Sequence, residues 1–262
     1  MYPGNINGGG GSRKDVKKAM ILAAGLGTRL KPWTDKHPKA LALVNGKTLL
    51  QRNVEYLQQA GIKDVVVNVH HFHKQVEAAI KNNNGWGSNI TISDESSAVL
   101  ETGGGLLHAA HLLKGEDAFV VINVDILTDM NLSSMINYHQ EKKPLVTLAT
   151  STRETSRYLL FDEGNNLCGW RNIINGEEKT VSPLVKDALA NAQQKAFSGI
   201  HIINPEIFNY IKQQGKFSII DVYMDLMKDH TIKSFDDNES RFIDVGKPES
   251  VLMAEAMFSV RI

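Results

Sequence analysis

The strongest constraint on this chain is an apolar run that breaks into a glycine loop and is followed by two basic residues. Residues 20–23 are apolar and predict a short buried strand. Gly25 and Gly27 follow directly, and glycine lets the backbone turn tightly and bring its N–H groups close to an anion. Arg29 adds a planar guanidinium and Lys39 a compact ammonium, and both suit phosphate oxygens. The stretch therefore predicts a polyphosphate-binding loop.

Other interpretations of these glycines are weaker. A dinucleotide-binding loop requires G-x-G-x-x-G, but Leu30 occupies the third glycine position, which disfavours a dehydrogenase. Residues 46–48 read Gly-Lys-Thr, yet Leu41 stands where a Walker A loop needs its first glycine. An ordinary strand-to-helix turn would also use glycine. It does not explain why Thr28, an arginine and a Pro-Lys pair crowd into the same short segment.

Residues 22–50, LAAGLGTRLKPWTDKHPKALALVNGKTLL, resemble the signature of the sugar-1-phosphate nucleotidyltransferases. Later motifs extend the resemblance over most of residues 19–258. It implies that the loop wraps a nucleoside triphosphate and that Arg29 and Lys39 neutralise its phosphates. The nucleotide-binding positions that it implies in this part of the chain are Ala23, Ala24, Gly25, Gly27 and Thr28.

Composition limits the alternatives. The chain has 262 residues, 42% hydrophobic and 22% charged, which suits one globular domain over residues 19–262. A formal net charge of zero provides no basic field for nucleic acid or an anionic membrane. Cys168 is the single cysteine, which excludes an internal disulfide. No apolar run is long enough to span a bilayer. Together these observations predict a cytoplasmic protein. Residues 1–18 have the glycine-rich composition of a flexible linker.

Strand and helix patterns alternate after the loop. Thr48 and Gln51 form a capping-box pattern for a helix that ends at Gly61, and residues 64–69 are the apolar run of a central parallel strand. This rhythm predicts an α/β fold, a Rossmann-like, doubly wound mixed sheet whose ligands collect beyond the carboxyl ends of the strands. Asn68 is placed to meet a ribose or base there, or to cap the next turn. His70 and its neighbours are interpreted as loop-edge surface.

Two aspartates follow strand-like runs far apart in the chain. Residues 118–124 predict a buried strand that delivers Asp125, and residues 241–243 deliver Asp244. On the residues alone, either could be a simple helix cap. The resemblance implies that both are catalytic and ligate Mg²⁺, a hard cation that prefers oxygen ligands.

A glycine-rich segment, Leu100-Glu101-Thr102-Gly103-Gly104-Gly105, precedes a helical pattern. The resemblance implies that Thr102, Gly103 and Gly104 lie at the nucleobase, with main-chain contacts. The alternative is that the glycines let a helix pack tightly against the sheet, and both can hold together. The form of this segment resembles the branch of bacterial N-acetylmuramate-1-phosphate uridylyltransferases.

The resemblance places the nucleotide half over about residues 19–130 and a small sugar-binding lobe over about residues 145–204. In this lobe it implies that Arg171, Ser198 and Gly199 face the sugar. Arg171 is otherwise a solvated surface residue, and Trp170 is expected in the core.

We therefore expect Mg²⁺-dependent transfer of a nucleotidyl group to a sugar 1-phosphate, with release of pyrophosphate. The favoured substrates are UTP and N-acetylmuramate 1-phosphate, whose product would serve cell-wall recycling. Mannose-1-phosphate guanylyltransferase and glucose-1-phosphate uridylyl- or thymidylyltransferase are alternatives, as is an inactive subunit that senses nucleotide-sugars. Neither nucleic acid nor membrane is an expected partner, and we expect a monomer or weak homodimer.

Overall fold

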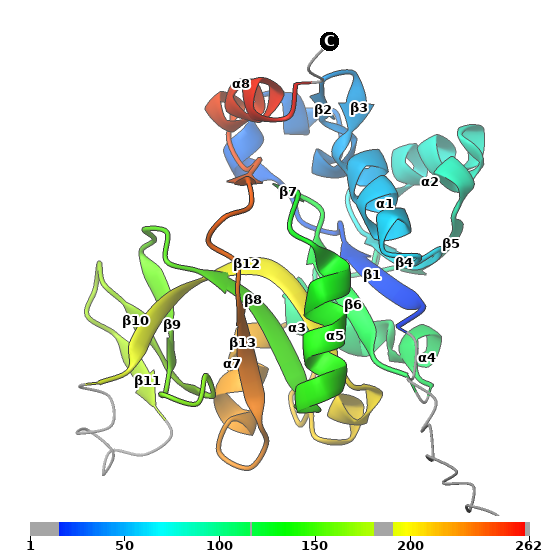
Figure 1. Cartoon of the computed structure of the whole chain (residues 1–262). Helices are drawn as coiled ribbons and strands as arrows, with labels where there is room; N and C mark the ends of the chain where they lie inside the picture. Colours follow the sequence, from blue (N-terminus) through cyan, green and yellow to red (C-terminus); the bar gives the residue numbers. More distant parts are fainter. Residues whose placement is uncertain (1–15, 116, 181–190, 260–262) are drawn as a thin grey trace, which may run out of the picture.

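The computed structural model describes residues 16–115, 117–180 and 191–259. Its centre is a large mixed sheet with the strand order β11-β10-β9-β12-β6-β1-β4-β5, to which β8 and β13 are joined beside β12 (Figure 1). The parallel part comprises β1 (Lys18–Leu22), β4 (Asp64–Val69), β5 (Asn89–Asp94) and β6 (Phe119–Asn123). The expected strands therefore form, although β6 ends two residues before Asp125.

Helices cover both faces of this sheet, which confirms the doubly wound fold. Along β4 the side chains alternate, so Val65 and Val67 pack into one core and Val66 into the other. The first core includes residues of α1 (Leu49–Gln59), α2 (His73–Asn82), α5 (Leu132–Lys142) and α8 (Pro248–Met257). The second includes residues of α3 (Glu101–His108), α4 (Ala110–Leu113) and α7 (Ile219–Leu226).

Helix α1 forms where the capping pattern predicted it. The Thr48 hydroxyl accepts a hydrogen bond from the Gln51 N–H at 3.0 Å, and Gly61 adopts a φ of +79° just beyond the last turn. The Gln51 side chain donates instead to Glu55 at 2.9 Å, so only half of the capping box is present. This helix contacts residues 39–41, the segment that begins with Lys39.

The antiparallel half of the sheet contains β8 (Val146–Ser151), β9 (Arg157–Phe161), β10 (Leu167–Asn172), β11 (Glu178–Thr180), β12 (Gln193–Ile203) and β13 (Ile232–Asp236). Strand β12 bonds to β9 through residues 193–195 and to β6 through residues 200–203. We call β9, β10, β11 and residues 193–197 the small lobe. It projects from the parallel half, as Figure 1 shows.

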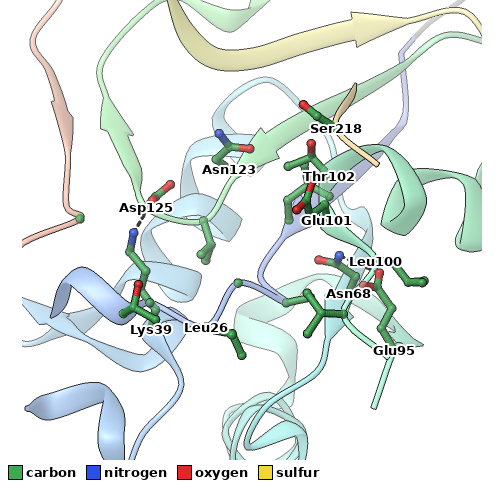
Figure 2. Close-up of a pocket in the computed structure, with 18 of the residues that line it drawn as sticks. Leu26, Lys39, Asn68, Glu95, Leu100, Glu101, Thr102, Asn123, Asp125 and Ser218 are labelled. Carbon is green, nitrogen blue, oxygen red and sulfur yellow. Dashed lines mark hydrogen bonds and ion pairs between the residues drawn. The ribbon is translucent and has the colours of Figure 1, made fainter. Parts of the chain in front are cut away.

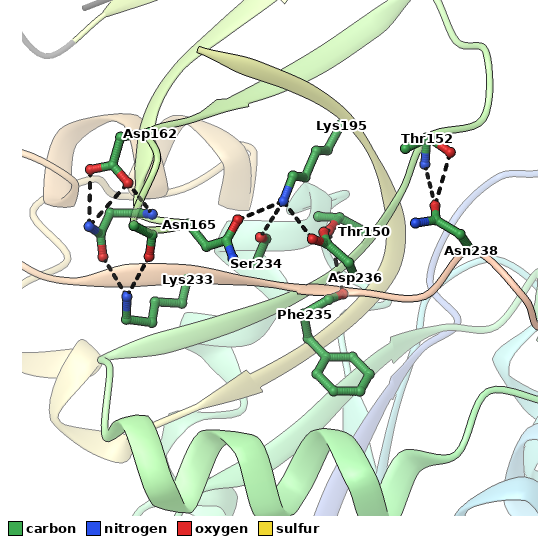
Figure 3. Close-up of polar contacts among 12 residues, drawn as sticks. Thr150, Thr152, Asp162, Asn165, Lys195, Lys233, Ser234, Phe235, Asp236 and Asn238 are labelled. Carbon is green, nitrogen blue, oxygen red and sulfur yellow. Dashed lines mark hydrogen bonds and ion pairs between the residues drawn. The ribbon is translucent and has the colours of Figure 1, made fainter. Parts of the chain in front are cut away.

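A buried lysine fastens the small lobe to β13 (Figure 3). The Lys195 ammonium, with a side chain 5% exposed, donates to Asn165 Oδ1 at 2.8 Å, Ser234 Oγ at 3.0 Å and Asp236 Oδ2 at 2.7 Å. The Thr150 hydroxyl donates to the other oxygen of Asp236 at 2.8 Å. A buried ammonium is stable only when its donors are satisfied, so this network sets where the β9–β10 turn lies.

The folded core begins earlier than the linker-like composition suggested. Val16 is buried, and Lys18 opens β1 and donates to the Leu112 carbonyl at 2.7 Å. The rest of the expected linker lies outside the described residues. No helix within residues 16–115, 117–180 and 191–259 is long and apolar enough to cross a membrane.

The four remaining strands form two small ribbons. Strands β2 (Leu43–Val44) and β3 (Lys47–Thr48) pair beside α1, and β7 (Ile126–Thr128) pairs with β14 (Phe242–Asp244). Lys47, the lysine of the Gly-Lys-Thr sequence, forms an ion pair with Glu55 at 2.7 Å on the surface. It therefore does not belong to a phosphate loop.

Candidate active site

The glycine loop, residues 23–27, leaves the carboxyl end of β1 and curves around an open cavity. Gly27 has a φ of +62°, a left-handed conformation that favours glycine. A Cβ at this position would lie 2.9 Å from Thr34 Cγ2 and 3.0 Å from Lys39 Cβ. The Thr34 hydroxyl donates to the Gly27 carbonyl at 2.9 Å. Gly27 therefore lets the loop pack directly on the segment that carries Lys39.

The cavity beside the glycine loop, called here the main cavity, has a volume of about 580 Å³. Figure 2 shows Lys39 and Asp125 on one side of it and Asn68 and Glu95 on the other. The residues that line it are Leu22, Ala24, Gly25, Leu26, Gly27, Thr28, Arg29, Lys39, Asn68, Glu95, Val99, Leu100, Glu101, Thr102, Asn123, Val124, Asp125, Lys216, Ser218 and Gly246. Most of the positions predicted from the sequence therefore lie around one space.

Lys39 and Asp125 form an ion pair at the edge of the main cavity. Their side chains are 9% and 19% exposed, so both charges are largely withdrawn from water. Lys39 opens a short 3-10 helix, η3 (Lys39–Leu41), after the extended Pro38. Asp125 follows β6, and the Val124 carbonyl beside it accepts a hydrogen bond from Asn53 Nδ2 at 2.9 Å. Both charged groups thus extend from a fixed backbone.

Asp244 reaches the same place through the ribbon of β7 and β14. Asp244 pairs with Ile126, and the Val245 N–H donates to the Asp125 carbonyl at 2.8 Å. The Arg29 guanidinium lies 3.5 Å from the Asp244 carboxylate, and both side chains are about half exposed. Gly246 makes this approach possible, because a Cβ there would lie 2.7 Å from Arg29 Nη2. The predicted convergence of the two aspartates is therefore present in the structure.

The electrostatics of Asp244 show that the aspartates act on one another. Burial, and then the negative charge of Asp125, raise the pKa of the Asp244 carboxyl above its usual value, while Lys39 and Arg29 lower it. Two carboxylates repel each other here, beside two cations. A bound metal cation would relieve this repulsion. No group of three or more His, Cys, Asp or Glu residues with metal-site geometry occurs in the described part of the chain. A metal here would therefore take further ligands from substrate or water.

Asn68 is engaged by the protein on both sides of its amide. Its Oδ1 accepts from the Ala23 N–H at 2.6 Å, and its Nδ2 donates to Glu95 Oε1 at 2.8 Å. A Cβ at Gly105 would lie 2.7 Å from that oxygen, so Gly105 leaves room for the buried acid. Asn68 thus holds the start of the glycine loop in addition to lining the cavity. It does not cap the following helix, α2.

Glu95 is the main residue at the site that the sequence analysis missed. It is 1% exposed, its Oε2 has no hydrogen-bond partner among the described residues, and burial raises its pKa above the usual value. The signal that could have identified it is an acid just beyond a parallel strand: Glu95 lies one residue after β5, and Asp125 lies two residues after β6. The expectation that His70 is simple surface was incomplete, because its Nδ1 lies 2.7 Å from the Glu95 carbonyl.

The glycines after Thr102 serve packing. They lie inside α3, where a Cβ at Gly103 would be 2.5 Å from Phe217 Cδ2 and one at Gly104 would be 2.2 Å from the Gly215 carbonyl. Neither glycine lines the main cavity. Thr102 does line it, and its hydroxyl accepts from the Ile219 N–H at 3.0 Å. Both glycines therefore allow close packing, but against residues 215–219 before and at the start of α7 and not, as the sequence had suggested, against the sheet.

The three predicted sugar-binding residues are not brought together. Gly199 lies near the main cavity, since a Cβ there would be 2.9 Å from Asn123 Nδ2. Ser198 lines a different cavity, beside Arg153 and Arg241. The Arg171 guanidinium pairs with Glu178 at 2.5 Å, on the face of β10 opposite to Trp170. The three residues therefore do not share one surface, since alternate residues of a strand face opposite sides. Their contact with a sugar stays a prediction.

A side cavity of about 380 Å³ lies next to the main cavity, and Ser218 lines both. It lies between the small lobe and α7. Its other lining residues are Thr155, Arg157, Leu159, Trp170, Lys179, Phe197, Ile220 and Asp221. Trp170 was expected in the core, but it is only partly buried and forms a wall of this cavity.

Comparison with known proteins agrees with this geometry. An N-acetylmuramate alpha-1-phosphate uridylyltransferase of Caulobacter vibrioides is 33% identical over 92% of this chain and 96% of its own length. One from Neisseria meningitidis is 31% identical over 92% of this chain and 97% of its own. A mannose-1-phosphate guanyltransferase of Yarrowia lipolytica is 28% identical over 92% of this chain and 64% of its own.

Solved structures share the fold. A putative glucose-1-phosphate thymidylyltransferase from Bacillus anthracis superimposes with a TM-score of 0.77 at 19% identity, covering 94% of this chain and 97% of its own. A UDP-glucose pyrophosphorylase in complex with UDP-glucose superimposes with a TM-score of 0.72 at 21% identity, covering 92% of this chain and 97% of its own. The model of the nucleotidyl transferase family matches residues 18–259, which include the glycine loop and both aspartates. The chain belongs to the nucleotidyl transferase family, as its resemblance to sugar-1-phosphate nucleotidyltransferases predicted.

Proposed function

We propose that this enzyme transfers the uridylyl group of UTP to N-acetylmuramate 1-phosphate and releases pyrophosphate. The observation that carries the proposal is the meeting of Arg29, Lys39, Asp125 and Asp244 at one edge of the main cavity, beside the glycine loop. Two cations and two carboxylates at the edge of a cavity lined by a glycine loop suit a polyphosphate and its counterion. The choice of substrates follows the relatives from Caulobacter and Neisseria.

The reaction needs little proton chemistry from the protein. An oxygen of the sugar phosphate attacks the α-phosphorus of the nucleotide, the new P–O bond forms, and the bond to pyrophosphate breaks. A phosphate monoester has a second pKa near 6. Its oxygen is therefore already ionised at neutral pH, and no serine or histidine base is required. The protein contributes position and charge, as in other phosphoryl transfers.

The residues divide this work between them. Backbone N–H groups of the glycine loop hold the triphosphate, and Lys39 leaves Asp125 to bind the sugar phosphate or the α-phosphate. Arg29 stabilises the charge that develops on the departing pyrophosphate. Asn68 keeps the loop in place through the Ala23 N–H. Lys39 must therefore change its partner when the substrates bind, whereas the glycine loop is held in place before they arrive.

The two aspartates suit Mg²⁺, which prefers oxygen ligands and keeps water or substrate phosphates as the rest of its shell. Burial and repulsion by the nearby Asp125 both raise the pKa of the Asp244 carboxyl, and this pair of close carboxylates is the observation that fits the ion. When bound, Mg²⁺ would neutralise phosphate charge, and Asp125 and Asp244 would hold it. We propose it as the cofactor on these grounds.

The experiment is a matrix of four nucleoside triphosphates against several sugar 1-phosphates, scored by pyrophosphate release with and without Mg²⁺. We expect the highest rate with UTP and N-acetylmuramate 1-phosphate, and loss of the rate after chelation. A maximum with GTP and mannose 1-phosphate, or with glucose 1-phosphate, would replace the proposed substrates. No release in any cell of the matrix would favour a subunit that only senses nucleotide-sugars.

A further inference from the structure

The side cavity has no role in the phosphate chemistry above. It lies beside the main cavity, on the side of the small lobe, and the two share Ser218 at the start of α7. Along β12, Phe197 lines the side cavity, while Gly199 lies against Asn123 of the main cavity. Residues two apart in a regular strand are about 7 Å apart, and the register shift between Phe197 and His201 leaves Phe197 and Gly199 no farther apart than that. A substrate with its phosphate at Lys39 can therefore extend along β12 into the side cavity.

Strand register places positive charge on the wall of this cavity. Lys179 lies opposite Trp170, and Trp170 lies opposite Leu159, so the three side chains share one face of the small lobe. Arg157 is two residues before Leu159 and shares that face. The Lys179 ammonium lies 5.6 Å from the centroid of the Trp170 ring. Two cations thus flank one aromatic wall.

The pairing of these charges leaves one cation open. Lys179 forms an ion pair with Asp221 of α7 at 2.8 Å, and both side chains are about half exposed. The Arg157 guanidinium has no hydrogen-bond or ion-pair partner in residues 16–115, 117–180 and 191–259. Two cations and one carboxylate give the cavity one net positive charge. A free guanidinium fork suits a carboxylate, with which it forms two parallel hydrogen bonds.

We propose that the side cavity selects sugar 1-phosphates that bear a carboxylate, which Arg157 and Lys179 bind while Trp170 packs against the sugar substituent. This rests on the proposed function, because it assumes that the acceptor is a sugar 1-phosphate. N-acetylmuramate differs from N-acetylglucosamine by a lactyl ether that ends in a carboxylate. The cavity therefore gives a physical basis for preferring the first of these sugars over the second.

The test compares the 1-phosphates of these two sugars at saturating UTP, with the wild type, Arg157→Gln and Arg157→Lys. We expect Arg157→Gln to lower kcat/KM for the acidic sugar about 10-fold, mainly through KM, since a partly exposed charged hydrogen bond contributes about 1.4 kcal/mol. The kcat/KM for the neutral sugar should change less than about twofold, because this sugar has no carboxylate to pair with Arg157. Arg157→Lys should recover part of the loss, because it keeps the charge.

Two further variants make the result specific. Lys228→Gln removes the same charge at an exposed position that does not line the cavity, and it should leave the preference unchanged. Arg171→Gln tests the residue indicated by the sequence resemblance. A loss of preference in Arg171→Gln but not in Arg157→Gln would overturn the assignment of the side cavity.

Calorimetric titration of both sugar 1-phosphates into the protein separates this inference from the proposed function. If the acidic sugar binds more tightly than the neutral one, and this advantage is lost in Arg157→Gln, the proposed role of the side cavity is supported. This holds even if no nucleotide is transferred. Equal binding of the two sugars, unaffected by Arg157→Gln, overturns the inference even if pyrophosphate is released with both. Unchanged unfolding midpoints of the variants show that the fold is intact.

Discussion

The two ends of the proposed substrate site are built differently. At the phosphate end, the glycine loop, Lys39 and Asp125 extend from a backbone that close packing fixes, and Gly27 has no room for a side chain. At the acceptor end, the side cavity is formed by side chains from four strands and α7. A phosphate looks the same in every substrate, so backbone can bind it. Sugars differ in their substituents, and only side chains can vary to match them.

The largest expected effect tests the phosphate end. Lys39→Ala should lower kcat about 1,000-fold, since a preorganised charge at the reacting phosphate contributes about 4 kcal/mol to the transition state. Asp125 borders the main cavity and can be solvated, so the fold should remain. Lys47→Ala is the matched control, because Lys47 pairs with Glu55 on the surface. Turnover of Lys39→Ala close to that of the wild type would remove Lys39 from the mechanism. Pyrophosphate release and circular dichroism are the measurements.

A pair of glycine variants separates backbone strain from crowding. Gly27→Ala and Gly46→Ala both place a Cβ at positive φ, which costs about 1–2 kcal/mol. Only at Gly27 would this Cβ also press on Thr34 and Lys39, whereas nothing lies within 4 Å at Gly46.

We therefore expect Gly27→Ala to lose about 30-fold in kcat, or about 2 kcal/mol, beyond any loss in Gly46→Ala. Steady-state kinetics at saturating concentrations of both substrates would measure this. Equal activity of the two variants would mean that the packing of the loop on Lys39 is unimportant.

The buried ammonium tests the acceptor end. Lys195→Met should lower the free energy of unfolding by about 2 kcal/mol, since Asp236 is partly solvated and the loss is smaller than for a fully buried pair. The sugar phosphate KM should rise while the UTP KM stays constant. Lys233 is a more exposed lysine that donates hydrogen bonds to the same turn, at Gly164 and Asn166. Lys233→Met should therefore lower the free energy of unfolding by less than Lys195→Met does. Urea unfolding and kinetics check both statements. An equal rise in the UTP KM would show that the two ends are not independent.

The smallest effect is a pH dependence of stability that has opposite signs for two buried histidines and for the two acids near the main cavity. Burial lowers the pKa of His139, which contacts Thr147 of β8, to about 4 and that of His201, which contacts Tyr223 of α7, to about 3. Below pH 6.5 the unfolded chain binds protons at these histidines and the folded chain does not. Lowering the pH from about 6.5 toward 4 therefore decreases the free energy of unfolding. At pH 6 the decrease is about 0.8 kcal/mol for each histidine.

Glu95 and Asp244 have raised pKa values, so the folded state binds their protons more readily. Their contribution to stability has the opposite sign and decreases as the pH rises through the raised pKa values. Unfolding measured at pH 8 and pH 6 in His139→Gln and His201→Gln should show a flatter dependence than in the wild type. An unchanged slope would contradict neutral, buried histidines.

The sequence predicted the phosphate end well because its signals are local. The apolar strand, the glycines, Arg29 and Lys39 lie within one short stretch, and the family resemblance singled out Asp125 and Asp244 at the ends of strand-like runs. Residues of the acceptor end were predicted poorly. Whether Arg157 or Arg171 faces a cavity depends on which face of its strand it occupies, and that depends on register across three strands. Glu95 was missed because its partners, Asn68 and Gly105, become neighbours only in the folded sheet.

Strand β12 has a consequence for how this scaffold can change its substrate over evolution. Its first residues are hydrogen-bonded to β9 and its last to β6, so one continuous backbone spans the interval between the proposed sugar and phosphate sites. Lengthening or shortening that interval would require breaking two ladders at once. New acceptor preferences are therefore expected to arise by exchanging residues such as Arg157 and Lys179, while the spacing of the scaffold is inherited unchanged.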